Sequence, residues 1–91
     1  RPAEEEQMRA EFPELNGYMN ELKKRSAGRG TLALRELRRL IEDYPREPLM
    51  KALSEAALYG LYDLERVERM VLKNVRSEFF RLKDDPPEPD A

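Results

Sequence analysis

The sequence predicts an all-α fold, a small bundle of about four helices. Apolar residues recur at helical spacing along four segments, and glycines and prolines gather between these segments. Apolar and charged residues each make up 40% of the chain, which is typical of strongly amphipathic helices. Ninety-one residues are enough for one domain with a single modest core.

The first predicted helix begins near Pro13, since proline suits the first turn of a helix. Its apolar stripe consists of Phe12, Leu15, Met19 and Leu22. The segment 26–30, which contains two glycines, ends it. Residues 1–12 read as a polar N-terminal extension or a frayed helix, and the helical domain is expected to cover residues 13–82.

A second helix is predicted from Thr31, a suitable N-cap, to the residue before Pro45. Short breaks then favour an αα-hairpin over residues 48–82. Gly60 is expected to end its first arm and Asp63 to cap its second. The apolar stripe of the second arm runs through Leu64, Val67, Val71, Val75, Phe79 and Leu82. Residues 83–91 are acidic and rich in proline, and they are expected to form a disordered tail.

The composition excludes most catalytic chemistry. The chain has no cysteine and no histidine, and it lacks glycine-rich phosphate loops and the calcium-loop pattern. We therefore expect no enzyme activity of its own, no cofactor, no metal and no small-molecule substrate. No apolar run is long enough to span a membrane, and we expect a cytoplasmic protein. Because the chain begins at Arg1 and not at Met, we expect a piece of a longer protein.

The strongest candidate surface is a basic row on the last predicted helix. Helical spacing places five residues on one face: Arg66, Arg69, Lys73, Arg76 and Phe80. Such a row binds phosphates with an aromatic beside them, or it meets an acidic protein partner. The third interpretation is a solvated face supported by pairs such as Glu65 with Arg69.

Residues 49–72 also match part of a DNA-binding helix-turn-helix. Ala56 and Gly60 fit the small residue and the turn glycine of that motif. Its two apolar positions in the second helix fall on Arg66 and Arg69, so the pattern is incomplete, and an ordinary αα-hairpin explains it as well.

Two further groups are candidates for binding. Tyr59, Leu61 and Tyr62 surround Gly60, where they either close the end of the core or form a docking knob. A shorter basic patch, a weak candidate for nucleic acid, consists of Arg35, Arg38 and Arg39. The acidic residues around that patch favour surface ion pairs instead.

Residues 31–80 resemble the region near the C-terminus of bacterial IstA-type transposases. The matching segments are Leu37-Arg38-Arg39-Leu40, Asp43-Tyr44-Pro45-Arg46 and residues 57–72. The last segment has the core pattern of the match, in which the sequence Tyr-Gly-Leu-Tyr-Asp separates two predicted helices. The resemblance implies a non-catalytic piece that lies beyond a catalytic domain and is linked to assembly and to a partner AAA+ ATPase, IstB. It offers no catalytic residues to transfer onto these positions.

The leading hypothesis is therefore a helical domain of a DNA transposase that binds a protein, either the AAA+ ATPase or a second copy. Under this hypothesis, contact with DNA is expected through the parent protein. We expect the docking surface to comprise the turn residues and the basic row with Phe80. One alternative is direct contact with DNA phosphates, and another is a purely structural or dimerisation role.

Overall fold

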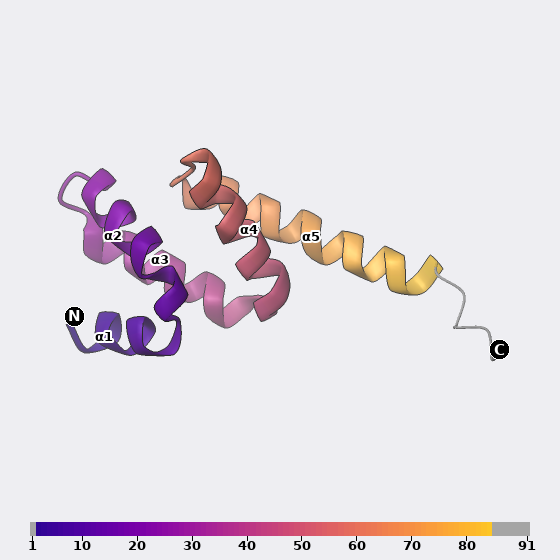
Figure 1. Cartoon of the computed structure of the whole chain (residues 1–91), viewed down its shortest axis with the longest axis horizontal. Coiled ribbons are helices and arrows are strands. Elements are labelled where there is room, and N and C mark those ends of the chain that lie inside the picture. Colours follow the sequence, from indigo (N-terminus) through magenta and orange to yellow (C-terminus); the bar gives the residue numbers. More distant parts are fainter. Residues whose placement is uncertain (1, 85–91) are drawn as a thin grey trace.

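Five α-helices and one short 3-10 turn make up the computed structural model, which describes residues 2–84 (Figure 1). The elements in chain order are α1 (Pro2–Glu11), the 3-10 turn η1 (Pro13–Leu15), α2 (Asn16–Arg25), α3 (Gly30–Asp43), α4 (Arg46–Tyr59) and α5 (Leu64–Asp84). The all-α prediction is confirmed, and within the described residues there is no strand.

The residues predicted as a polar extension form a helix that lies against the core. Met8 and Phe12 are four residues apart, so they share one face of the helical turn, and both are buried. The chain then turns at Phe12, where Pro13 opens η1 and continues into α2. Ion pairs from Glu4 to Arg38 and from Glu5 to Lys23 hold α1 to α3 and α2. The helical core therefore begins before residue 13.

The predicted N-cap at Thr31 is wrong, because the N-cap lies two residues earlier, at Arg29, and α3 begins at Gly30. Arg29 occupies the cap position without a side-chain hydrogen bond, and its carbonyl accepts the first helical bond, from Ala33. Ala27 and Gly28 take positive φ angles of 50° and 88° after α2. These two residues complete the turn early, so Thr31 already lies within the first turn of α3.

The turn between α4 and α5 matches the prediction at both ends. Gly60 has a φ of 69°, and the Leu61 N–H donates to the Ala56 carbonyl at 2.7 Å in a Schellman arrangement. Asp63 Oδ1 accepts a hydrogen bond from the backbone N–H of Glu65 at 3.1 Å, as an N-cap does. Pro45 ends α3 by holding Tyr44 extended, and Pro48 lies in the first turn of α4.

Alanine at two glycine positions is expected to change stability in opposite directions. Gly60→Ala costs about 1 kcal/mol because an L side chain disfavours the left-handed backbone, although no atom lies within 4 Å of an added Cβ. Gly17→Ala stabilises by about 0.5–1 kcal/mol, because Gly17 is helical and its added Cβ meets equally open space. Urea unfolding of both variants measures whether the free energy of unfolding falls or rises. Equal losses would show that space, and not backbone conformation, limits both positions.

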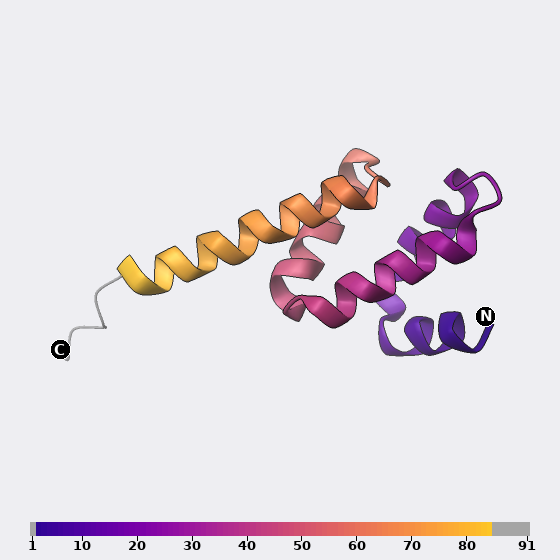
Figure 2. The same cartoon turned by 180° about the vertical axis from the view of Figure 1, so that it is seen from behind.

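A single apolar core connects all five helices, and α5 extends past it. The buried cluster runs from Met8 in α1 to Val71 in α5. Asn74 Nδ2 donates to the Pro48 carbonyl at 3.2 Å, so the first turn of α4 lies beside the middle of α5. Beyond that point α5 projects away from the other helices in both views, and the molecule measures 56 × 23 × 20 Å (Figures 1 and 2). The projection divides the stripe of α5 into a buried part and an exposed part.

The two parts of this stripe have different surroundings. Val67 and Val71 have 0% exposure, whereas Phe79 is 57% exposed. The reason is the unequal length of the hairpin arms, since α4 has 14 residues and α5 has 21. The tail predicted at 83–91 overlaps the last two residues of α5, and its remainder, 85–91, lies outside the described residues.

Candidate functional site

The turn at Gly60 divides into a part that anchors the fold and a part that faces solvent. The Tyr62 ring stacks on Tyr18 with centroids 4.8 Å apart, and the Arg25 guanidinium lies 4.8 Å from the same ring. The Tyr18 hydroxyl donates to the Leu61 carbonyl at 2.9 Å, and burial raises the pKa of this phenol far above its ordinary value. Leu61 and Tyr62 therefore attach the turn to α2 and are unsuited to be a free docking knob.

Tyr59, the third turn residue, is left on the surface. Its side chain is 68% exposed, and the adjacent Leu58 is 76% exposed. Both lie in the last turn of α4, whose buried face is made by Leu49, Ala52, Leu53 and Ala56. Of the three residues in the predicted cluster around Gly60, Tyr59 is the exposed one, whereas Leu61 and Tyr62 are partly buried.

The basic row of α5 lies on the face turned away from the core. Arg66, Arg69, Lys73 and Arg76 are all exposed, and the pair expected between Glu65 and Arg69 does not form. In the part of the chain that the structure describes, none of these four cations takes part in an ion pair. Within the described residues, no carboxylate therefore lies close enough to any of them to form an ion pair.

Exposed apolar side chains lie beside the cations on the same helix. Leu72 is 44% exposed, Phe79 57% and Phe80 54%, and the two phenyl rings meet edge to face with centroids 5.6 Å apart. Arg76 follows Leu72 by four positions and precedes Phe80 by four, so helical geometry places it between them. We call this set the α5 docking surface: Arg69, Leu72, Lys73, Arg76, Phe79 and Phe80.

The sequence analysis named the cations and Phe80 as candidates, did not name Leu72 and assigned Phe79 to the apolar stripe alone. A usable signal was present in the lengths of the two hairpin arms. An apolar stripe of about five turns cannot be covered by a shorter partner helix, so its far end must face solvent or another molecule.

The arginines of α3 differ from those of α5 because most of their charge is neutralised within the fold. Arg38 pairs with Glu4 at 3.0 Å and with Glu42 at 3.1 Å. Arg39 contacts three carboxylates, those of Glu36, Asp43 and Glu68. The structure thus contains the surface ion pairs that were the alternative interpretation of this patch.

Glu68 connects α5 to α3 through two charge-assisted contacts. The Tyr44 hydroxyl donates to Glu68 Oε2 at 2.6 Å, and Arg39 Nη2 donates to Oε1 at 2.9 Å. These two hydrogen bonds lower the pKa of Glu68 below its ordinary value, and the first of them raises the pKa of Tyr44. This arrangement fixes the first half of α5 in place and leaves the basic row on the opposite side.

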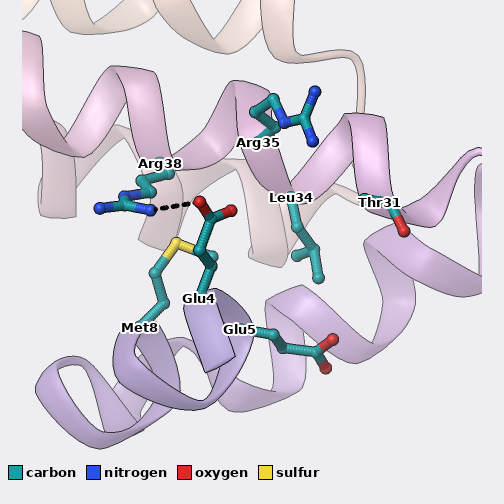
Figure 3. Close-up of a pocket in the computed structure, with 7 residues that line it drawn as sticks. All are labelled: Glu4, Glu5, Met8, Thr31, Leu34, Arg35 and Arg38. Carbon is teal, nitrogen blue, oxygen red and sulfur yellow. Dashed lines mark ion pairs between the residues drawn. The ribbon is translucent and has the colours of Figure 1, made fainter. Parts of the chain in front are cut away.

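Arg35 lines a pocket of about 280 Å³ between α1 and α3 (Figure 3). The pocket mixes carboxylates from α1 with guanidinium groups from α3, and the Glu4–Arg38 ion pair crosses it. Met8 and Leu34 form its apolar part. Opposite charges at its rim give it no preference for an anion, so it does not strengthen the nucleic-acid interpretation of this patch.

The α4–α5 hairpin does not reproduce the interior of a helix-turn-helix. That motif requires inward apolar side chains where α5 has Arg66 and Arg69, and both are exposed. Val67 and Val71 face the core instead. The hairpin is an αα-hairpin whose outer face is cationic.

No protein-family model, curated protein or solved structure matches the chain. The α5 docking surface is therefore interpreted from its own residues. Across the described residues, no helix has the length and apolar character needed to cross a membrane. The same residues hold no group of three acidic side chains placed to share a metal ion.

Proposed function

We propose that this chain is a non-catalytic helical domain that binds a protein partner through the α5 docking surface. The observation that carries the proposal is the exposure of Leu72, Phe79 and Phe80 on a helix that outruns its neighbours. Large apolar side chains that are rimmed by charge typically mark interaction sites, and aromatic residues with arginine dominate binding energy there.

The buried part of the domain supports this role by holding α5 rigidly at its other end. Val67 and Val71 lie in the core, Asn74 bonds the Pro48 carbonyl, and Glu68 bonds Tyr44 and Arg39. A docking surface on a fixed helix loses little conformational entropy when a partner binds. The fold therefore fixes the half of α5 that leads into the docking surface.

The resemblance to IstA-type transposases supplies a specific partner for this proposal. In that setting the domain belongs to a DNA transposase, and its partner is the AAA+ helper ATPase or a second copy of the chain. Neither candidate requires a catalytic residue from this domain. If an AAA+ ATPase is encoded beside the parent gene, that ATPase is the first protein to test.

Phe80→Ala is expected to weaken binding to that ATPase, or self-association, by about tenfold, because an exposed aromatic anchor is lost. Titration calorimetry measures binding to the ATPase, and sedimentation equilibrium of the chain alone measures self-association. Leu58→Ala is the matched control, since Leu58 is more exposed but lies on α4. Unchanged binding in Phe80→Ala, with full helicity retained, would contradict the assignment of this surface.

A second candidate function is binding to nucleic-acid phosphates through the basic row. Among the described residues Arg66, Arg69, Lys73 and Arg76 make no ion pair, which favours this function. Such binding falls steeply with salt concentration, in proportion to the number of phosphates contacted. An interface built on Leu72 and the two phenylalanines changes much less with salt, so one salt series separates the two functions.

A further inference from the structure

We infer that the α5 docking surface selects an acidic amphipathic helix, one that carries apolar residues along a stripe and Glu or Asp beside it. This inference rests on the proposed function and adds the chemistry of the partner. It follows from the way cations and apolar side chains alternate on the exposed part of α5.

The alternation defines two complementary requirements. Leu72, Phe79 and Phe80 offer apolar surface along two turns of the helix, which matches the i, i+3, i+4, i+7 anchors of a partner helix. Arg69, Lys73 and Arg76 lie among them without ion pairs inside the described part of the domain. Carboxylates at the edges of the partner stripe meet these cations, and removal from water strengthens each attraction.

A second copy of the chain does not meet these requirements. An isologous contact places the same patch on both sides of the interface. With two antiparallel α5 helices paired about a centre between Leu72 and Lys73, Arg69 of one copy faces Arg76 of the other. Like charges at such an interface repel each other, so self-pairing through this surface is disfavoured.

Nucleic acid satisfies the cations but not the aliphatic side chain among them. Leu72 is aliphatic and 44% exposed, and a phosphate backbone offers it no apolar contact. The charge of the region is also small, since residues 29–82 contain eleven Lys or Arg and nine Asp or Glu. Modules that bind nucleic acid carry a much stronger basic excess.

Three labelled synthetic peptides of about 20 residues, long enough for a helix, test the inference. All three have the same leucine stripe, and the positions beside it are Glu, Gln or Lys. Fluorescence anisotropy with the whole chain is expected to show about tenfold tighter binding of the Glu peptide than of the Gln peptide, and the weakest binding for the Lys peptide. The double variant Lys73→Glu/Arg76→Glu is expected to reverse this order.

Arg29→Glu/Arg35→Glu is the matched control, because both side chains are exposed cations outside the docking surface and make no ion pair within the described residues. It should keep the preference for the Glu peptide. Leu72→Ser should weaken the binding of all three peptides, which checks that the apolar side chains of α5 contribute to binding.

The remaining outcomes overturn the inference in distinguishable ways. If the three peptides bind with equal affinity and the Leu72→Ser variant no longer binds them, the preference for an acidic partner is refuted. The proposed function is then still supported. Binding of a duplex oligonucleotide in place of the peptides, or a dimer that Leu72→Ser dissociates, would identify a different occupant. Absence of peptide, oligonucleotide and self-binding would contradict both the inference and the proposed function.

Discussion

Leu53→Ala is expected to lower the free energy of unfolding by about 2–5 kcal/mol, the largest effect of any single change considered for this domain. Leu53 is 1% exposed and lies in the core face of α4. Its truncation removes apolar contacts and leaves a cavity that a small, closely filled core cannot fully close. A domain of this size loses about 4–8 °C in melting temperature for each kcal/mol, so the shift should exceed about 8 °C.

Leu58→Ala provides the comparison within the same helix and with the same chemical change. Leu58 is 76% exposed, and its truncation should alter the free energy of unfolding by no more than about 0.5 kcal/mol. Urea denaturation followed by circular dichroism measures both variants. Similar losses in the two would mean that α4 does not face the core with the side containing Leu53.

Met8→Ala is expected to cost about 2 kcal/mol or more, because Met8 is 5% exposed and anchors α1 to the core. The sequence predicted residues 1–12 as a polar extension or a frayed helix, for which the same change would cost almost nothing. Gln7→Ala is the control, since Gln7 is the preceding residue and lies on the exposed face of α1.

Amide hydrogen exchange shows whether this loss is local. A helix at the end of the chain can detach without unfolding the rest, so α1 amides should exchange faster in Met8→Ala than those of α3. Uniformly faster exchange would indicate that α1 unfolds together with the whole core. Equal stability of Met8→Ala and Gln7→Ala would place α1 outside the cooperative unit.

Local structure was largely predictable because it depends on residues within about one turn of each other. The positive φ of Gly60, the cap at Asp63 and the stop at Pro45 each follow from the chemistry of one residue and its neighbours. Thr31 shows the limit of such reasoning. Its side chain suits an N-cap, but the turn at Ala27 and Gly28 determined where α3 begins.

The proposed α5 docking surface was only partly predictable. Helical spacing alone placed Arg66, Arg69, Lys73 and Arg76 on one face. Spacing could not show that Arg38 and Arg39 would form ion pairs while these four form none within the described residues, since the carboxylates of Glu4 and Glu68 reach α3 from distant parts of the chain. Ion pairing between elements depends on how the helices come together.

The sequence by itself determined the helices from α2 to α5, their amphipathic faces and the turn at Gly60, because backbone preference and periodicity are properties of short segments. Tertiary structure alone decided that Val71 is buried and Phe79 exposed on one stripe, and that Tyr62 stacks on Tyr18 while Tyr59 faces solvent. Burial requires a second surface, and only the folded arrangement determines where α4 ends beside α5 and where α2 meets the turn.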